Sequence, residues 1–262
     1  MTARPKKSFG QHFLHERRYI ERIVGAIAPR AGDVVVEIGP GEGALTLPLL
    51  AAAGRLTAIE LDTDLIPGLR ARATAVGDLA VIHADVLATD FTALARELGV
   101  PRLRLAGNLP YYISSPILFH CVAHADAIED MHFMLQKEVV DRMAAAPGGK
   151  TYGRLSVMLQ LACRVEPLFT VPPGAFRPPP KVDSAVVRLV PLAPDERHDA
   201  DPQRLHAIVK AAFAQRRKTL GNALRQTLDA DSIRRAGIDP QARAETLAPA
   251  DYVRLAKLDA SI

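Results

Sequence analysis

The chain has 262 residues, of which 48% are hydrophobic and 24% charged, and its formal net charge is +4. This size and composition suit one full α/β domain with a smaller second domain. No run approaches the ~20 apolar residues of a membrane helix, and no apolar segment follows the N-terminal basic residues. We therefore expect neither a membrane protein nor a secreted one. Cys121 and Cys163 fit neither a disulfide framework nor a zinc site, and they indicate buried thiols in a reducing cytoplasm.

The positive charge is concentrated at the two ends of the chain. Residues 1–22 carry six Lys or Arg against two Glu, and residues 204–262 carry eleven against six acidic residues. A charge excess of this size is usually solvated surface. Two basic ends also suit binding to a polyanion, and the sequence alone leaves both interpretations open.

Apolar residues follow a pattern in which helices and strands alternate. A helix is expected over residues 16–28, because Ile20, Ile23 and Ile27 recur at helical spacing. The expected strands are 34–38, 56–61, 79–83, 103–106, 131–135, 165–171 and 184–190. The first five are separated by helical segments, which predicts a mainly parallel sheet covered on both faces. The last two follow each other directly and predict an antiparallel edge.

A proline-bounded polar segment divides the chain. Residues 191–202 read PLAPDERHDADP and are interpreted as a linker. Residues 1–190 are expected to form the α/β domain together with its basic N-terminal segment. Only helical patterns follow, so residues 203–262 are expected to form a small helical domain.

A glycine-rich turn follows the first of the predicted strands. Residues 37–43 read EIGPGEG, with the spacing G-x-G-x-G instead of the dinucleotide pattern G-x-G-x-x-G. Glu42 places a negative charge where a pyrophosphate needs exposed N–H groups. The turn therefore disfavours NAD and suits a ligand without phosphates, such as S-adenosylmethionine.

Acidic residues follow the next two strands. Glu60, some twenty residues beyond the glycines, can accept both hydroxyls of a ribose. Asp85 can accept from the amine of the cofactor adenine, although it can equally cap a turn. A glycine turn and two acids at three successive strand ends predict a cofactor site at one rim of the sheet.

The tetrapeptide Asn108-Leu109-Pro110-Tyr111 follows the fourth strand. An adenine amine is a weak nucleophile, because its lone pair is delocalised into the ring. Acceptors for its hydrogens favour tetrahedral nitrogen, and the Asn108 side-chain oxygen and the Pro110 main-chain oxygen can supply two of them. Tyr111 can stack on the base. The alternative is an asparagine-anchored turn beside a core tyrosine.

Eight segments carry a resemblance to a known family. In chain order they are FGQHFL (9–14), EIGPGEGALT (37–46), IELD (59–62), GNLPYYISSP (107–116), LQKEVVDRM (135–143), YGRLSVM (152–158), FRPPPKVDSAVVRL (176–189) and FAQRRKTLGNAL (213–224). Together they resemble the bacterial small-subunit rRNA adenine dimethyltransferases, within the wider rRNA adenine N(6)-methyltransferase family. The sequence departs from the family pattern at Tyr112, where many members carry Asn, and at His12, where some do.

The resemblance implies a Rossmann-like class I methyltransferase domain, with a seven-stranded, mainly parallel sheet and an antiparallel edge. It implies S-adenosylmethionine as methyl donor and no metal. The implied substrate is two adjacent adenines in the 3′-terminal hairpin loop of 16S rRNA, within an immature small subunit. A cytoplasmic monomer is expected. The implied cofactor site consists of His12, Leu14, Gly39, Glu60, Asp85 and Asn108.

The base and the RNA are expected to contact further residues. Phe176, in the loop before three prolines, is the candidate second aromatic face against the target adenine, next to Asn108, Pro110 and Tyr111; a hydrophobic plug is its alternative. The candidate phosphate-binding residues are Lys6, Lys7, Arg216, Arg217 and Lys218.

Three other functions compete with this interpretation. A large-subunit rRNA methyltransferase of the antibiotic-resistance type shares the glycine turn and NLPY, but the segment FRPPPKVDSAVVRL favours the small subunit. A non-catalytic RNA-binding factor on the same fold is disfavoured by the intact Glu60, Asp85 and Asn108. An NAD enzyme is disfavoured by the glycine spacing and by Glu42.

Overall fold

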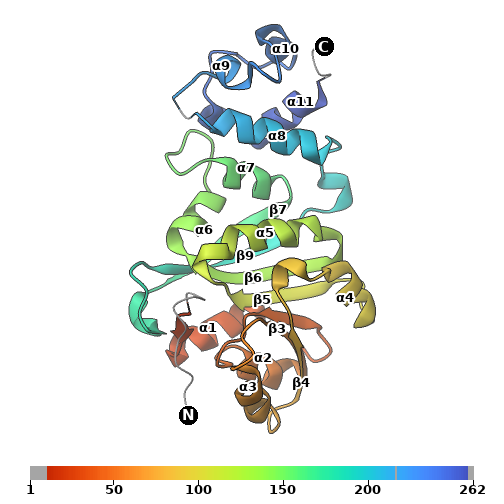
Figure 1. Ribbon diagram of the computed structural model, residues 1–262, viewed down its shortest axis with the longest axis vertical. Helices are drawn as coiled ribbons and strands as arrows, with labels where there is room; N and C mark the ends of the chain where they lie inside the picture. The colour runs from red at the N-terminus through yellow and green to blue at the C-terminus, as the bar shows by residue number, and fades with distance from the viewer. Residues whose placement is uncertain (1–10, 216, 259–262) are drawn as a thin grey trace. The chain divides into compact units, whose positions relative to one another are not determined.

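The computed structural model describes residues 11–215 and 217–258. Lys6, Lys7 and Arg216, which the sequence analysis proposes as phosphate-binding residues, lie outside the described residues. The chain forms two compact units, drawn with their elements in Figure 1. The first unit comprises the chain up to Val140 together with Glu166–Pro191, and the second comprises Asp141–Val165 together with the chain from Leu192 onward.

A seven-stranded sheet forms the centre of the first unit. Its strands, in spatial order, are β4 (Asp78–His83), β3 (Arg55–Glu60), β2 (Val35–Ile38), β5 (Leu103–Asn108), β6 (Ile128–Gln136), β9 (Ser184–Pro191) and β7 (Cys163–Val171). The pairs from β4 to β6 are parallel, whereas β6 and β9 are antiparallel. The predicted sheet and its antiparallel edge are confirmed. The strand order changes direction at β2: the chain adds β3 and β4 on one side of β2, and then β5 and β6 on the other side.

The central strands are mostly apolar, and neighbouring elements bury both of their faces. All four residues of β2 are buried, as are five of the six in β3. Helices α1 (Arg17–Ile27) and α2 (Thr46–Ala53) contribute Ile23, Ile27 and Leu49 to a core cluster that also contains Val35 of β2. The other helices that begin in this unit are α3 (Ile66–Ala73), α4 (Phe91–Glu97), α5 (Ser114–Ala123) and α6 (Lys137–Met143).

A second, two-stranded sheet joins the start of the described chain to the proline-rich loop. Strand β1 (Phe13–Leu14) pairs antiparallel with β8 (Phe176–Arg177). Leu14 lies opposite Phe176 in this register, and both side chains are buried in the same core cluster as α1 and α2. The pairing brings residues about 160 positions apart in the sequence to the same edge of the unit.

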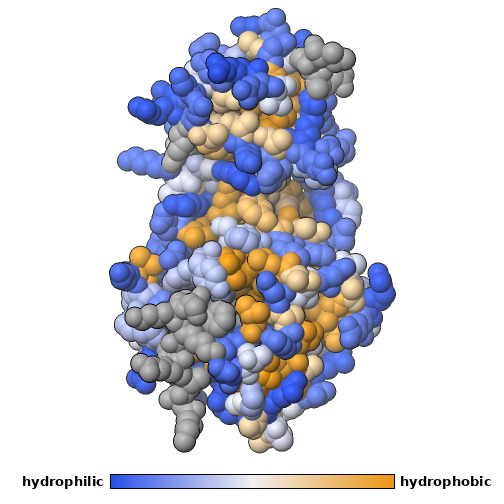
Figure 2. Space-filling view, viewed as in Figure 1, coloured by the Kyte–Doolittle hydropathy of each residue, from blue (hydrophilic) through white to orange (hydrophobic). Residues whose placement is uncertain are grey.

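The second unit is helical. Its helices are α7 (Arg154–Gln160), α8 (Pro202–Phe213), α9 (Leu220–Leu224), α10 (Ala230–Arg235) and α11 (Pro249–Lys257). They enclose an apolar core in which the Phe213 and Tyr252 rings stack with centroids 5.8 Å apart. The Tyr152 hydroxyl, also buried there, donates to the Leu247 carbonyl at 2.9 Å. Hydrophilic side chains form most of the outline of this unit in Figure 2.

The two units do not have the boundaries expected from the sequence, where one domain was to end at residue 190 and the other to begin at residue 203. Residues 141–165 were expected within the α/β domain, but the structure groups them with the C-terminal helices. Tyr152 and Val157 explain this grouping, because both are buried against apolar residues of α8 and α11. The expected linker contains the short 3₁₀ helix Pro194–Glu196, and α8 begins within it, at Pro202.

Neither a membrane span nor a metal cluster is found in the described part of the chain. No described helix is long and apolar enough to cross a bilayer. No group of three or more His, Cys, Asp or Glu among those residues is arranged to hold a metal ion. Cys121 and Cys163 are buried free thiols.

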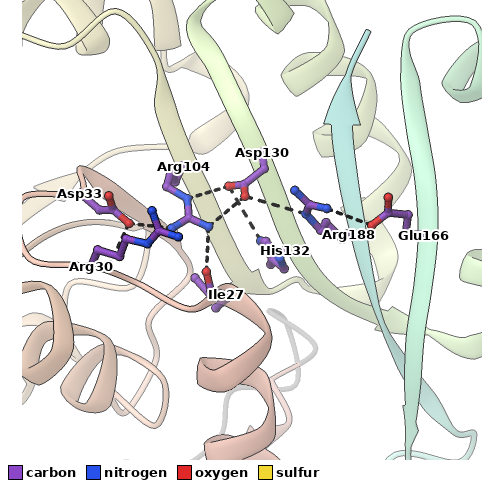
Figure 3. Close-up of polar contacts among 8 residues, drawn as sticks. All are labelled: Ile27, Arg30, Asp33, Arg104, Asp130, His132, Glu166 and Arg188. Atoms are coloured by element: carbon purple, nitrogen blue, oxygen red, sulfur yellow. Dashed lines mark hydrogen bonds and ion pairs between the residues drawn. The ribbon is translucent and has the colours of Figure 1, made fainter.

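A buried polar network crosses the sheet near the amino end of β5 (Figure 3). The Arg104 guanidinium donates to Asp33 at 2.7 Å, to both carboxylate oxygens of Asp130 at 3.0 and 2.9 Å, and to the Ile27 carbonyl at 2.7 Å. His132 lies 3.9 Å from Asp130, but burial lowers its pKa to about 4, so the ring is neutral near pH 7. Arg104 is therefore the nearer of two cations that compensate the buried Asp130, since Arg188 Nε lies 4.0 Å from the same carboxylate.

Removing this cation should destabilise the first unit. Arg104→Ala leaves Asp130, whose side chain is only 6% exposed, without its bidentate partner. We expect the free energy of unfolding to fall by about 3–5 kcal/mol, measured by urea denaturation. Arg17→Ala is the matched control, because its ion pair with Glu21 is exposed and should contribute about 0–1 kcal/mol. Equal losses from the two variants would contradict the prediction.

Candidate functional site

The principal cavity of the first unit opens where the parallel strands β2 to β5 end. It contains about 1080 Å³ of empty space, its open mouth included. Five segments supply most of its lining, namely residues 11–14, the end of β2 with the turn after it (37–45), residues 59–62, residues 84–86 and residues 108–113, and Ile117 of α5 completes it. The cavity thus lies at the switch point of the sheet, where open α/β folds bind their ligands.

The glycine turn is held against the end of the next strand. Gly39 donates its N–H to the Ile59 carbonyl at 2.9 Å, and Gly41 donates to Glu60 Oε2 at 3.1 Å. Gly41 adopts φ +58°, and a Cβ there would lie 3.1 Å from the Phe13 ring. Glycine is therefore needed at position 41 both for its left-handed backbone and for the close approach of Phe13.

Glu60 is buried, and backbone N–H groups take up both of its carboxylate oxygens. Oε1 accepts from Asp62 N at 2.8 Å, and Oε2 accepts from Gly41. Burial raises the pKa of Glu60, whereas the bonds from Asp62 and Gly41 lower it. Each carboxylate oxygen has further lone pairs, so Glu60 can still accept from a ligand in the cavity that it lines.

Glu37 is a second buried acid of this cavity, and the sequence analysis did not include it among the site residues. Its side chain is 1% exposed, and its Oε2 has no hydrogen-bond partner. Burial raises the pKa of Glu37 to about 7, the Thr46 hydroxyl opposes this rise, and the neighbouring Glu60 charge reinforces it. An unsatisfied buried carboxyl favours a cationic or hydrogen-bond-donating ligand.

Asp85 lies at the rim and combines the two roles considered for it. Its Oδ1 accepts from Leu87 N at 2.9 Å and so caps the short helix after β4. The residue is exposed and lines the cavity, which leaves Oδ2 for a ligand.

The Asn108 amide has a defined orientation. Its Nδ2 donates to the His12 main-chain carbonyl at 3.0 Å, so its Oδ1 remains as the acceptor of the side chain. His12 is itself held at the wall, because its Nδ1 lies 2.8 Å from the Pro178 carbonyl oxygen. The Pro110 carbonyl accepts from Ile113 N at 3.3 Å and keeps a second lone pair.

Tyr111 is held at two points. Its hydroxyl lies 2.6 Å from Ser184 Oγ, and its ring stacks on His12 with centroids 5.7 Å apart and an interplanar angle of 27°. Ser184 is fully buried at the start of β9 and was not predicted as a site residue. Burial raises the pKa of Tyr111, and the bond with Ser184 partly offsets the rise.

The position of Phe176 differs from the expected position beside the target base. Its side chain is 2% exposed, it belongs to the core cluster beneath β1, and it does not line the cavity. In this structure it is the hydrophobic plug that the sequence analysis considered as the alternative. An aromatic contact with a substrate base would require Phe176 to leave this position.

The structure therefore brings most of the predicted site residues together. Pro110 and Tyr111 line the same cavity as all six expected cofactor-binding residues. These six are His12, Leu14, Gly39, Glu60, Asp85 and Asn108. Arg217 and Lys218 are exposed between α8 and α9 of the second unit.

Comparison with known proteins identifies the family. The family model described as "Ribosomal RNA adenine dimethylase" matches residues 2–260. The chain belongs to this family. It therefore transfers methyl groups from S-adenosylmethionine and acts on adenine of ribosomal RNA.

Similar proteins cover almost the whole chain. "Ribosomal RNA small subunit methyltransferase A" of Xanthomonas oryzae pv. oryzae and that of Xanthomonas campestris pv. campestris are each 60% identical over 258 residues, covering 98% of this chain and 97% of the relative. The structure of a dimethyladenosine transferase from Plasmodium falciparum matches with a TM-score of 0.79 and 25% identity, covering 93% of this chain and 96% of that one. The structure of the 23S rRNA methyltransferase ErmE matches with a TM-score of 0.70 and 26% identity, covering 93% and 97%.

The residues of the cavity fit the methyl donor of an adenine dimethylase. S-adenosylmethionine carries cationic groups, ribose hydroxyls and an adenine amine, and it has no phosphate. Glu37, Glu60 and Asp85 supply carboxylates to the wall, and none of the described lining residues is Lys or Arg. The unpartnered Oε2 of Glu37 is the clearest single match, because a buried carboxyl without a partner is costly until a donor or a cation reaches it.

Glu37 should make the stability of the cofactor-free protein depend on pH. Burial raises the pKa of Glu37 to about 7 in the folded state, whereas the pKa of an exposed glutamate in the unfolded chain is 4.5. Stability should therefore fall as the pH rises through this window, by a few kcal/mol, and level off above it. Glu37→Gln carries no ionisable group and should lack this component.

The measurement is urea unfolding of both proteins at several values between pH 5 and pH 8. We expect the stability of Glu37→Gln to exceed that of the wild type increasingly as the pH rises. Parallel pH profiles for the two proteins would show that Glu37 ionises normally.

Proposed function

We propose that this enzyme dimethylates N(6) of two adjacent adenines in the 3′-terminal hairpin loop of 16S rRNA. The proposed substrate is an immature small ribosomal subunit in the cytoplasm, and the enzyme acts as a monomer. The single observation that carries the proposal is the cavity in which Asn108, its amide oriented by the His12 carbonyl, lies beside the glycine turn and Glu60. The small-subunit assignment is supported by the name of relatives that are 60% identical over nearly their full length.

The cofactor would be held by its ribose, its adenine and its cationic end. Glu60 would accept from the ribose hydroxyls and Asp85 from the adenine amine, while Gly39, His12 and Leu14 would complete the wall. When bound, the cofactor supplies a methyl group activated by a sulfonium. A carboxylate at Glu37 would balance part of the cofactor charge inside a buried site.

The reacting adenine would be oriented by acceptors on its amine. Asn108 Oδ1 and the second lone pair of the Pro110 carbonyl would accept the two N–H hydrogens, which favours a nitrogen lone pair directed at the methyl group. Tyr111, held by Ser184 and His12, would stack on the base. The amine becomes acidic as it is methylated, so its proton can leave to water and no strong base is needed. These residues therefore contribute chiefly orientation.

Phe176 would join this site only after a local rearrangement. In its present position Phe176 is buried in the core cluster, and the aromatic rings that line the cavity are those of His12, Phe13, Tyr111 and Tyr112. The proposed role of Phe176 against the second face of the adenine therefore depends on movement of the β1–β8 pair, whose register places it opposite Leu14.

A large-subunit substrate is the second candidate. The structural similarity to the 23S rRNA methyltransferase ErmE extends over 93% of this chain, so the fold alone does not separate the two substrates. The 60% identity to proteins named for the small subunit favours the first candidate. Radiolabelled methyl transfer to immature small subunits and to large subunits, followed by mapping of the modified base, distinguishes them.

Catalysis should depend on Asn108 more than cofactor binding does. Asn108→Ala removes the oriented acceptor, and we expect turnover on immature small subunits to fall about 100-fold or more at saturating cofactor. Calorimetric titration with S-adenosylmethionine should show a much smaller change in affinity. Near-full turnover of the variant would show that Asn108 is only a structural turn residue.

The exposed cations between α8 and α9 should contribute to RNA affinity. We propose that Arg217 and Lys218 contact phosphates, together with Arg216, Lys6 and Lys7, which lie outside the described residues. Neutralising Arg217 and Lys218 to Gln should weaken binding to immature subunits. It should also flatten the salt dependence of log K by about 0.7 per lost contact on single-stranded RNA.

The control for this experiment is Arg234→Gln in α10, because its guanidinium already pairs with Asp231. Cofactor affinity should be unchanged in all of these variants. A wild-type salt slope in the doubly neutralised protein would show that the two side chains are ordinary solvated surface.

A further inference from the structure

Tyr112 is unusual among the exposed apolar residues of this chain. The exposed large hydrophobic residues that the structure describes are Leu61, Val76, Tyr112 and Val182. Tyr112 is the most exposed of them, at 57%, and it alone has an aromatic face. No hydrogen bond or ring contact engages its side chain within the described part of the chain. A single exposed apolar side chain is ordinary at a protein surface, but this ring stands at a cavity, where a ligand can reach its face.

The backbone beneath Tyr112 is well anchored. Tyr112 is the central residue of the 3₁₀ helix Tyr111–Ile113, which continues directly into α5 at Ser114. Ile113 N donates to the Pro110 carbonyl, and Ser114 Oγ donates to the Tyr111 carbonyl at 3.1 Å. The exposed ring is therefore presented from a fixed turn, which lowers the entropy lost when a ligand stacks on it.

The two consecutive tyrosines take different positions at the same cavity. Successive side chains in a 3₁₀ helix diverge by about 120°, because the helix has three residues per turn. Tyr111 is half-buried, with its hydroxyl on Ser184, whereas Tyr112 is exposed; both line the cavity. Tyr111 thus belongs to the inner wall, and Tyr112 to the outer rim.

We propose that Tyr112 forms a second base-binding subsite, which stacks on the nucleobase next to the adenine held in the cavity. This inference rests on the proposed function, in which one base of a single-stranded loop enters while its neighbour stays outside. Removing a base from the stack of a loop exposes one face of the neighbouring base. In this subsite the uncharged ring of Tyr112 covers that face at the rim of the cavity.

This subsite would recognise a nucleobase by stacking alone. No Lys or Arg is among the described residues that line the cavity, so the rim offers an aromatic surface and no phosphate clamp. Stacking tolerates every base. A purine has a larger ring surface than a pyrimidine, so a purine neighbour should bind better. The subsite would therefore select the context of the target adenine, whereas Asn108 and Pro110 would select its amine.

The test combines a change in the protein with a change in the RNA. Tyr112→Ala and Tyr112→Phe are compared with the wild type on immature small subunits in which methylation is measured at one fixed adenine of the pair, while its neighbour is either adenine or uracil. We expect Tyr112→Ala to raise KM for the adenine-flanked subunit about fivefold to a hundredfold, with little change in kcat. Tyr112→Phe keeps the ring and should behave as the wild type does.

The decisive readout is the preference for the neighbouring base. The wild type and Tyr112→Phe should favour adenine over uracil severalfold in kcat/KM, and Tyr112→Ala should lose this preference. Val76→Ala, which truncates an exposed apolar residue outside the cavity, is the control and should change neither quantity. An unchanged preference in Tyr112→Ala would overturn the proposal, as would a loss of kcat with KM unaltered.

The outcome separates this inference from the function on which it rests. If the wild type methylates neither subunit, the proposed substrate is wrong, and so is a subsite for its neighbouring base. If the wild type methylates both subunits with the same kcat/KM, the substrate stands and the Tyr112 subsite is rejected. Affinity for S-adenosylmethionine, measured by calorimetry, should be the same in all four proteins.

Discussion

The Glu60 carboxylate joins two loops at the cavity. One oxygen accepts from Gly41 in the turn after β2, and the other accepts from Asp62 in the turn after β3. These bonds fix the glycine turn where Gly41 approaches the Phe13 ring, and both residues line the cavity at the carboxyl ends of the strands. Because these bonds are made to a buried group, their loss would leave two unpaired N–H donors at the site.

The acids of this cavity are held at a cost that a cationic ligand would relieve. Glu37 and Glu60 are both buried, and burial raises the pKa of each. A neighbouring negative charge raises the pKa of Glu37 further, so the cofactor-free site disfavours full ionisation. A ligand that carries positive charge and hydroxyl donors, and no phosphate, suits this environment. The same electrostatics that destabilise the empty pocket therefore favour a sulfonium cofactor over a dinucleotide.

Different physical interactions would serve the target base and the rest of the RNA. For the proposed base the cavity offers oriented acceptors and aromatic rings, namely Asn108, Pro110, Tyr111 and Tyr112. These are short-ranged and insensitive to salt, so they suit selection of one nucleotide. Exposed cations such as Lys218 act over longer distances, are screened by salt and carry no information about the base.

The sequence by itself determined the order of the strands and the chemistry of their ends. Periodic apolar runs predicted all seven strands of the sheet, and the positions of Gly39, Glu60, Asp85 and Asn108 after four of them predicted one shared site. These predictions depend on local pattern and on the rule that parallel strands end at a common edge. Both can be obtained without knowledge of any long-range contact.

Only the tertiary structure decided how distant side chains meet. Ser184 contacts Tyr111 because β9 lies antiparallel to β6, a register that no local pattern specifies. Phe176 is buried because β8 pairs with β1, so its aromatic character did not reveal its position. Residues 141–165 join the helical unit for the same reason, since burial of Tyr152 depends on partners some fifty or more residues away. Burial and hydrogen bonding are properties of the folded neighbourhood, and the sequence states only which residues can take part.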